Sequence, residues 1–411
     1  MSEEEKKEII ADLHIHSKYS RATSINLDLK SVSAYAKIKG LNLLGTGDFT
    51  HPKWFHELKS NLVEKEKGVY YYQDFPFIFT TEVSLIYTKG RGRRVHILIL
   101  APSIEIVEQI NSYFASKGRL DYDGRPIFKI TCPELTEDLM KISKDIEIIP
   151  AHAWTPWFGI FGSMSGFDSL KEAFEDKESC IHAIETGLSS DPEMNWKISE
   201  LNNRTILSFS DAHSFWPWRL GREATIFETD KENINYNDIL NAIRTNGIRA
   251  TIEVDPAYGK YHYDGHRLCN FSCSPKQSKE LNNTCPVCKK PLVIGVENRV
   301  NELADQETYV RVMKKTIKPY YKILPLHEIL SIAHSSPISS KKIVPIYDSL
   351  IKRFGNEFNI LLRAEKQDIA KIDLKSAELI LQNRIGNIKV KPGYDGVYGE
   401  ALLSETQKKL I

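Results

Sequence analysis

Asp12-Leu13-His14-Ile15-His16 follows the apolar run Ile9-Ile10-Ala11 near the start of the chain. An apolar run that ends in alternating polar residues predicts a β-strand with His14 and His16 on the same side. Two imidazoles placed in this way can bind one transition-metal ion. The alternative is an edge strand that merely carries two polar residues, and the rest of the chain favours the metal site.

Five more strand-like runs carry residues that ligate metals. The runs and their candidate ligands are 41–47 with Asp48 after it, 77–81 with Glu82 after it, 94–100 with His96 inside it, 146–151 with His152 after it, and 205–210 with Asp211 and His213 after it. Taken singly, each is explained by a core histidine or by a helix-capping carboxylate. In barrel enzymes, however, the carboxyl ends of parallel strands share one face, where active sites form. The recurrence therefore predicts one metal cluster.

Helical patterns alternate with these runs over residues 8–255. They cover residues 29–39, 104–114, 134–143 and 234–244. Alternation of this kind indicates βα units with parallel strand pairing, and hence an α/β fold. A turn-rich stretch at 255–259 marks the end of this part.

The motifs together resemble those of the PHP (polymerase and histidinol phosphatase) superfamily over roughly residues 8–255. The resemblance rests on the 12–16 motif, Glu82, His96, Pro150-Ala151-His152 and Ser210-Asp211-Ala212-His213. It implies a distorted (β/α)7 barrel with a cluster of two or three divalent ions (Zn, Mg or Mn). It assigns His14, His16, Glu82 and Asp211 to one ion, Glu82, His96 and His152 to a second, and Asp48 with His213 to a third.

The chain departs from the superfamily pattern in two places. Arg21 and Ala22 stand where many members carry a further His or Asp, and Thr46-Gly47-Asp48 stands where many have Thr-Asp-His. Asp48 is the expected ligand of the second motif and His51 is its alternate. The third ion is therefore the least determined of the three.

Further stretches narrow the resemblance to the endonuclease Q family, and with them it covers nearly the whole chain. They are residues 12–24, residues 46–52, four cysteines after the barrel, and Lys391-Pro392-Gly393-Tyr394-Asp395-Gly396-Val397-Tyr398-Gly399. This resemblance implies a DNA repair nuclease. Its expected substrate is double-stranded DNA, cut on the 5′ side of uracil, hypoxanthine, xanthine or an abasic site.

The four cysteines have the spacing of a zinc site. Cys269 and Cys273 are followed by the Cys285-Pro286-Val287-Cys288 knuckle. Four thiolates suit a tetrahedral structural zinc ion, in which backbone amides can reach the sulfurs. The alternatives are free thiols, or His266 in place of Cys269. Cys132 and Cys180 are isolated and are expected in the core.

Hydropathy and charge indicate in which compartment the protein works and what kind of partner it binds. No apolar run approaches the 18 residues of a membrane span, and the charged start lacks a secretory signal, so we expect a cytoplasmic protein without a membrane partner. Residues 258–411 hold 25 Lys and Arg against 16 Asp and Glu, whereas residues 1–257 hold 30 against 38. The basic half suits a polyanion, although a Lys-rich surface alone would also explain it.

Helical patterns return after Pro291, at 296–304, 326–333, 343–354 and 374–382. We therefore expect three parts: a catalytic barrel at 1–257, a zinc-binding module at 258–295, and a helical DNA-binding region at 296–411. Further candidate partners of such an enzyme include a replication sliding clamp.

Substrate-binding candidates lie between the metal motifs. Trp154, Trp157 and Phe158 follow His152 and are of a type that stacks on an extruded base, although large aromatics could simply cover the barrel mouth. Arg222 is a candidate phosphate contact. Ser189 lies beside Ser190 and Asp191 at another strand end, where the group could bind substrate or cap a helix.

Three functions of different class fit these residues. A DNA endonuclease, with His14, His16, Glu82, His152, Asp211 and His213 in catalysis, accounts for all of them, because metal-activated water suits phosphoester hydrolysis. A small-molecule phosphomonoesterase of the histidinol-phosphate kind would need neither the zinc module nor the basic tail. A non-catalytic nucleic-acid-binding protein would not need a nearly complete ligand set.

Overall fold

The computed structural model describes residues 6–307 and 317–402. Its central feature is a mixed sheet whose core is the parallel set β1 (Lys7–Asp12), β2 (Leu43–Gly45) and β5 (Phe75–Lys89). Helix α1 (Leu29–Lys39) provides the crossover between β1 and β2. Asp28 caps its first turn and Gly40 ends it at a φ of 99°.

Antiparallel strands flank this core on both sides. On one side, β11 (Ala224–Thr229) pairs with β1 and β12 (Ala250–Glu253) pairs with β11. On the other, β6 (Arg91–Ala101) pairs with β5 and β8 (Glu147–Pro150) pairs with β6. The expectation of parallel pairing throughout is therefore only partly right. A glycine turn at Gly90 (φ 69°) joins β5 directly to β6, which leaves no room for a crossover helix.

Strand residues converge on one apolar interior. Its members include one side chain from each of β1, β2, β5, β6, β8, β9 (Ala183–Glu185), β10 (Thr205–Leu207) and β11: Ile9, Leu43, Ile78, Leu98, Ile149, Ala183, Leu207 and Phe227. Helix α7 (Tyr236–Arg244) adds further side chains to it. The opposite faces of several of these strands pack into a larger cluster under the surrounding helices. The strands thus enclose a barrel-like core.

The remaining elements of this part surround that core. They are the strands β3 (Val63–Glu66), β4 (Val69–Tyr72) and β7 (Ile127–Phe128), and the helices α2 (Pro52–Asn61), α3 (Ile104–Lys117), α4 (Cys132–Ile142), α5 (Leu170–Phe174) and α6 (Pro192–Asn195). Among the described residues, no helix is both long enough and apolar enough to span a membrane.

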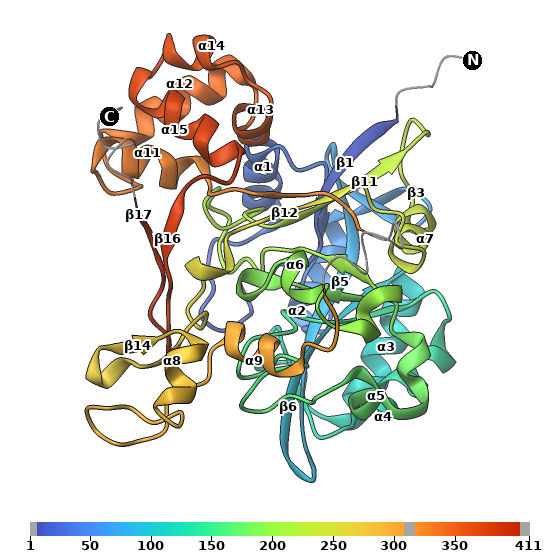
Figure 1. The fold of residues 1–411 in the computed structure, drawn as a ribbon. Coiled ribbons are helices and arrows are strands. Elements are labelled where there is room, and N and C mark those ends of the chain that lie inside the picture. The colour runs from blue at the N-terminus through green and yellow to red at the C-terminus, as the bar shows by residue number, and fades with distance from the viewer. Residues whose placement is uncertain (1–5, 308–316, 403–411) are drawn as a thin grey trace.

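The C-terminal part forms two further regions, which Figure 1 shows on one side of the barrel. The small lower region contains β13 (Asp264–His266), β14 (Phe271–Cys273) and α8 (Pro275–Glu280). The upper region is a helical lobe beside α1, made of α11 (Leu326–His334), α12 (Ile343–Phe354), α13 (Glu357–Leu362), α14 (Lys366–Ala370) and α15 (Leu374–Arg384). The hairpin of β16 (Lys389–Lys391) and β17 (Glu400–Leu402) runs between the two.

Two elements connect the barrel to the helical lobe. Helix α9 (Val296–Leu303) lies against α6 of the barrel, and β15 (Tyr320–Lys322) pairs in parallel with β12. Strand β15 thus extends the barrel sheet, and α9 packs on the barrel, before the lobe starts at α11. The lobe is docked by a buried ion pair of 2.6 Å between Lys39 Nζ and Glu357 Oε1.

Candidate active site

Four predicted ligands converge at the mouth of the barrel. Ligand atoms of His14, His16, Glu82 and Asp211 all lie within 4.8 Å of one another. His16 Nε2 is 2.9 Å from Asp211 Oδ1, and Glu82 Oε2 is 3.5 Å from His14 Nε2 and 3.4 Å from His16 Nε2. Two imidazole nitrogens and two carboxylates at these separations form a donor set for a divalent transition metal.

A second group shares Glu82. Glu82 Oε1 is 2.8 Å from His96 Nδ1 and 3.0 Å from His152 Nε2, and these two nitrogens are 3.2 Å apart. Each oxygen of Glu82 therefore faces a different group of histidines. A carboxylate in this position can bridge two ions, as in two-metal hydrolases.

Glu82 does not lie at a strand end as expected, whereas His96 lies within a strand as expected. Glu82 is in the middle of β5 and His96 is in the middle of β6. They are two residues away from direct pairing, since Glu82 is paired with Leu98 and Ser84 with His96. The long β5–β6 hairpin passes the barrel mouth instead of ending there.

Two carboxylates orient the first pair of histidines. Glu185 lies 2.9 Å from His14 Nδ1, and Asp48 Oδ1 lies 2.9 Å from His16 Nδ1. Each histidine thus turns its Nε2 toward the centre of the group, which is the arrangement of carboxylate-supported metal ligands. The backbone N–H of His152 also donates to Glu185, so one carboxylate supports both groups.

The donor atoms fit a bound metal. His14 Nε2 is buried and has no hydrogen-bond partner, although it faces Glu82 and Asp211. A buried polar atom without a partner costs free energy, and a cation between these groups would satisfy it. Burial favours the neutral form of His14, but the carboxylates of Glu185 and Glu82 raise its pKa well above the usual value. A metal ion would therefore replace a proton there.

Charge also holds the carboxylates in their ionised form. Burial would raise the pKa of Glu82, yet its contacts with His96 and with the cationic Arg125 hold that pKa well below its usual value. Burial opposes ionisation of Asp211 too, and His213 and His16 lower the pKa of that carboxyl well below its usual value. Burial lowers the pKa of His96 to about 4, so this imidazole is neutral and free to donate its lone pair.

Three of the site residues have a left-handed backbone conformation that is uncommon outside glycine. The φ angles are 47° at Asp48, 31° at His152 and 48° at Asp211. Such conformations cost roughly 1–3 kcal/mol each and persist only where the surrounding structure enforces them. Their concentration at the ends of three strands marks this mouth as a functional site.

Asp48, which the sequence predicts as a ligand, does not join either group. Its Oδ2 accepts hydrogen bonds from Ser17 N (2.6 Å), Ser17 Oγ (2.7 Å) and Ser20 Oγ (2.9 Å), while Oδ1 faces His16. Both of its oxygens thus contact Ser17, Ser20 or His16. The alternate, His51, stacks on Tyr19 with ring centroids 4.5 Å apart.

His213 lies beside the first group without completing a third. Its ring centroid is 4.5 Å from that of His16, and its Nδ1 is 2.9 Å from the carbonyl oxygen of Asp211. Among the described residues of the barrel mouth, the predicted pair of Asp48 with His213 does not form part of a metal-ligand group. The geometry supports two ion positions.

A cavity of about 840 Å³ opens directly over these groups. His96, His152 and Asp211 line it, together with Trp157 and Phe158 of the loop that follows His152. Tyr398 reaches it from the far end of the chain. Segments of the barrel, the linker and the C-terminal loop therefore build one cavity.

Of the aromatic residues predicted to contact the substrate, two line the cavity and one lies in the core. The ring of Phe158 is tilted against that of His96, with centroids 4.2 Å apart, and Trp157 contacts Tyr261 edge-on at 5.6 Å. Both aromatic residues line the cavity. Trp154, also predicted to contact the substrate, is instead fully buried, and its Nε1 donates to Asn195 in the core.

Two polar candidates also line the cavity. Ser189 lies in its wall, whereas the neighbouring Asp191 caps α6 by accepting from Met194 N. The guanidinium of Arg222 already donates to the carbonyl oxygen of Ser210 at 3.1 Å. Arg222 therefore supports the Asp211 loop at the same time as it borders the cavity.

The cysteine module brings together a slightly different set from the one expected. Ligand atoms of His266, Cys269, Cys285 and Cys288 lie within 4.8 Å of one another. Cys273 is outside this set; it is buried beside Cys285, and burial raises the pKa of its thiol. Burial opposes the thiolate of Cys285, but N–H groups of Cys288 and Val287 that donate to its sulfur lower its pKa. Donor types and spacing fit a structural zinc ion.

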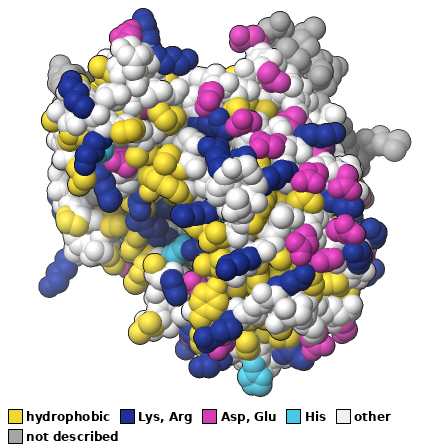
Figure 2. Space-filling model, turned by 90° about the horizontal axis from the view of Figure 1, so that it is seen from below, with side chains coloured by type: hydrophobic (Ala, Val, Ile, Leu, Met, Phe, Trp, Pro, Cys, Tyr) yellow, Lys and Arg dark blue, Asp and Glu magenta, His cyan; other side chains and the backbone are white. Residues whose placement is uncertain are grey.

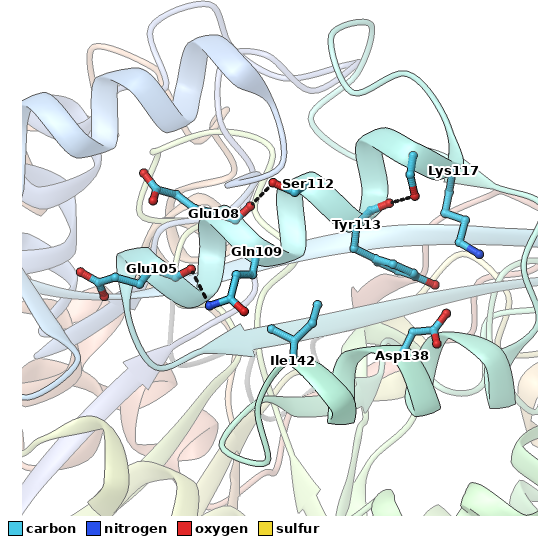
Figure 3. A pocket seen from close by; sticks show the side chains of 9 residues that line it. Glu105, Glu108, Gln109, Ser112, Tyr113, Lys117, Asp138 and Ile142 are labelled. Carbon is cyan, nitrogen blue, oxygen red and sulfur yellow. Dashed lines mark hydrogen bonds between the residues drawn. The ribbon is translucent and has the colours of Figure 1, made fainter.

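A further cavity of about 810 Å³ lies away from the metal groups, between α3 and α4. Figure 3 shows Tyr113 and Asp138 approaching each other across it, with Glu105 and Glu108 at its edge. Its carboxylates would repel a phosphate backbone, and no residue of either metal group borders it. It is therefore a poor candidate for a nucleic-acid site.

Sequence reasoning missed three residues of the site. Glu185 ends the apolar strand β9, and that placement was a usable signal. Asp12 opens the first motif, and its carboxylate accepts from Ser210 and Gly221, which joins the first and last metal motifs. Arg125 comes from a loop without any motif, and its Nη1 donates to Glu82 Oε2 at 3.0 Å.

Comparisons with known proteins agree with this architecture. The model of the MJ0043 C-terminal domain family matches residues 325–387, within the helical lobe. The protein MJ0043 of Methanocaldococcus jannaschii is 36% identical over 252 residues, which is 61% of this chain and 31% of MJ0043. The chain thus spans about a third of the length of that relative. YqxK of Bacillus subtilis is 29% identical over 416 residues, covering 96% of this chain and 99% of YqxK.

Two solved structures match nearly the whole chain. The lesion-specific endonuclease PfuEndoQ from Pyrococcus furiosus superposes with a TM-score of 0.87 at 32% identity, covering 98% of this chain and 97% of the other. An endonuclease Q complex with a 27-mer duplex that carries an abasic lesion at the active site superposes with a TM-score of 0.86 at 32% identity, covering 98% of both. On this full-length likeness, the chain belongs to the endonuclease Q family.

Proposed function

We propose that this protein is a metal-dependent endonuclease that cuts double-stranded DNA beside damaged bases. The observation that carries the proposal is the pair of metal-ligand groups that share Glu82 on the floor of an open cavity of about 840 Å³. Bound divalent ions would activate a water molecule for attack and would neutralise charge on the leaving oxygen. Family membership supplies the substrate class, because a related enzyme has been seen with lesion-containing duplex DNA.

The residues with proposed direct roles are His14, His16, Glu82, Asp211, His96 and His152 as ligands, with His213 beside them. Glu185 and Asp48 hold the first two histidines in place. We place the catalytic part in residues 1–257, a structural zinc module in 258–295, and a DNA-binding region in 296–411. The comparisons point to DNA as partner and give no support to a sliding clamp.

The cavity is suited to a nucleotide drawn out of the duplex. Phe158 and Trp157 provide aromatic surfaces, and Ser189 provides a polar group on the wall. Damaged or mismatched bases cost less to unstack, so extrusion itself favours lesions. We propose uracil, hypoxanthine, xanthine and abasic sites as substrates, with cleavage of the phosphodiester on the 5′ side.

Lysine and arginine side chains lie in and around the cavity. Arg125, Arg219, Arg222 and Lys260 line the cavity itself. Figure 2 shows basic side chains interspersed with hydrophobic ones around a hollowed region of the lower face. Such a surface suits a phosphate backbone that passes over the site.

The test uses matched duplexes that differ by one deaminated base or one abasic site. The full-length protein, loaded with Zn, Mg or Mn, should nick only the damaged duplex and leave a 3′-hydroxyl, a 5′-phosphate and the base still attached. His16→Ala and Asp211→Asn should abolish the nick, while His56→Ala, which removes an exposed histidine, should not.

Three results would count against the proposal. They are equal cutting of undamaged DNA, release of free base, and nicking on the 3′ side. Hydrolysis of a phosphomonoester with no nicking of any duplex would instead favour the small-molecule phosphatase.

A further inference from the structure

Arg125 lies at the floor of the cavity, on the carboxylate that both metal groups share. Its Nη1 is 3.0 Å from Glu82 Oε2, and its side chain is 24% exposed. Glu82 Oε2 is also the oxygen that faces His14 and His16. The guanidinium thus lies next to the metal ligands and still borders the open cavity.

The loop that carries Arg125 is held in place from several sides. Asp123 Oδ1 accepts the N–H of Arg125, and Gly124 N donates to the carbonyl oxygen of Tyr19. On the other side, Ser84 N of β5 donates to the carbonyl oxygen of Pro126. The backbone of Arg125 is therefore fixed relative to both the first histidine motif and the Glu82 strand.

Gly124 makes this placement possible. A Cβ at this position would lie 2.3 Å from Asp48 Oδ2 and 2.4 Å from Ser20 Oγ. The loop consequently passes directly over Asp48, which orients His16. The next residue, Arg125, therefore starts from a backbone that lies close to the metal ligands, and its side chain contacts Glu82.

Glu82 uses only a small part of the hydrogen-bonding capacity of Arg125. A guanidinium has five N–H donors, and among the described residues this one donates a single side-chain hydrogen bond, to Glu82. Two metal ions would draw on both oxygens of Glu82 and would compete for this acceptor. The remaining donors then face a cavity in which a phosphate group would approach the metals, and guanidinium groups bind phosphate oxygens in a planar, two-point manner.

We propose that Arg125 is a catalytic residue that binds one non-bridging oxygen of the phosphodiester undergoing hydrolysis. The proposal rests on the proposed nuclease function. In the reaction, water loses a proton to solvent, its oxygen bonds to phosphorus, the bond from phosphorus to the 3′ oxygen breaks, and that oxygen takes up a proton. The attacking hydroxide adds one negative charge to the phosphate group, and a fixed cation beside it stabilises the transition state.

The experiment compares wild type, Arg125→Ala and Arg125→Lys under single-turnover conditions on a lesion duplex. Arg119→Ala is the matched control, since Arg119 belongs to the same loop but has a side chain that is 76% exposed and pairs with Asp121. We expect Arg125→Ala to slow cleavage by about 10²–10³-fold, as loss of one transition-state donor does. Arg125→Lys should be intermediate and Arg119→Ala unchanged. Metal content and duplex affinity should remain close to wild type in all variants.

A second readout separates catalysis from support of Glu82. Duplexes with a single phosphorothioate of either configuration at the cleaved position report on each non-bridging oxygen. Removal of Arg125 should change the sulfur effect for one configuration and leave the other as in wild type. Arg125→Lys serves for this comparison if the alanine variant does not fold.

Several outcomes would overturn the proposal. Wild-type cleavage by Arg125→Ala would do so, as would a rate that falls only in proportion to lost metal, or equal changes for both phosphorothioates. If the wild-type protein cuts no lesion duplex, the proposed function itself fails, and this proposal fails with it. A defect confined to the Arg125 variants distinguishes the two cases.

Discussion

At the scale of single residues, the site is organised by carboxylates with different tasks. Glu82 and Asp211 face the centre of the cluster, whereas Glu185 and Asp48 stand behind the histidines. This division follows from geometry, because Glu185 and Asp48 face the Nδ1 atoms of His14 and His16, whereas Glu82 and Asp211 face the Nε2 atoms of the same two histidines. The same residue type thus serves as ligand or as support according to its neighbours.

Glu185→Gln should weaken metal binding without changing the ligands themselves. The amide keeps the size of Glu185 but removes the charge that faces His14 Nδ1. Loss of such a supporting partner typically costs 10–100-fold in metal affinity. Titration against a competing chelator measures the change, with Glu137→Gln, an exposed carboxylate of α4, as control. Unchanged affinity would show that Glu185 does not support a metal ligand.

A second buried carboxylate makes stability depend on pH. Burial raises the pKa of Glu253 to about 8, from 4.5. Its Oε2 accepts from Thr186 and Ser208, but its Oε1 has no partner. The folded protein thus retains a proton that the unfolded chain releases above pH 4.5. This contribution to stability is complete below pH 4.5 and is lost as pH rises toward 8.

Glu253→Gln should therefore stabilise the protein at alkaline pH. The free energy of unfolding of the variant, relative to wild type, should rise by at most about 1.4 kcal/mol per pH unit through this window and then level off. Urea denaturation at pH 5, 7 and 9 measures the difference. A constant offset at all three values would mean that Glu253 does not titrate between them.

At the scale of elements, the register of the β13–β14 hairpin determines which residues of the cysteine module lie together. The β13–β14 hairpin pairs His266 with Phe271, which brings the imidazole to the knuckle at Cys285 and Cys288. His266 Nδ1 lies 3.5 Å from Cys288 Sγ. Cys273 is paired with Asp264 at the other end of the hairpin, beside Ser278.

Substitutions can decide between the two possible sets of zinc ligands. Cys285 belongs to both sets, so Cys285→Ser should lose the zinc ion. The melting temperature should fall as well, because structural zinc stabilises small modules by on the order of 10 kcal/mol. If the set in the structure holds the metal, His266→Ala should lose zinc and Cys273→Ser should retain it. Elemental analysis of the purified variants measures this. The reverse pattern would restore the four-cysteine set, and zinc retained in all three would exclude both.

At the scale of the whole molecule, distant parts of the chain meet at the barrel mouth. Lys39 Nζ donates to Glu357 of the helical lobe and to the carbonyl oxygen of Pro217, in the loop after the Asp211 motif. The C-terminal loop returns to the linker, where Gly399 N donates to Tyr258 O. Buried contacts of this kind connect the lobe, the loop and the site in one body.

The β16–β17 hairpin should contribute to binding of the DNA backbone. Lys389 and Lys391 are exposed on β16, which leads into the loop whose Tyr398 lines the cavity. Replacing both by Gln should weaken duplex binding, and the slope of log affinity against log salt should become shallower by roughly 2, about one per lost phosphate contact. Fluorescence anisotropy across a salt series measures both quantities.

The control replaces charges on another face of the molecule. Lys141→Gln removes an exposed lysine of α4 that is paired with Glu137 and Asp138, and should leave the slope unchanged. An unchanged slope for the Lys389 and Lys391 variant would place the DNA path away from this hairpin.

The sequence by itself determined the elements and most of the site. Helical periodicity predicted α1, α12 and α15 closely, because the apolar side chains that recur at helical spacing are those that the core buries. Histidine and carboxylate residues at strand ends predicted the convergence of His14, His16, His152 and Asp211, since strands of one barrel deliver their ends to one mouth.

Only the tertiary structure decided which of these groups face the centre and which stand behind it. Asp48 became a support because Ser17 and Ser20 donate to its Oδ2 and its Oδ1 faces His16. Trp154 became a core residue because Asn195 accepts its N–H. Arg125 reached Glu82 from a loop that carries no periodic pattern. Contacts between residues far apart in the chain depend on how elements pack and on which hydrogen-bonding directions remain free, and local sequence patterns do not encode either.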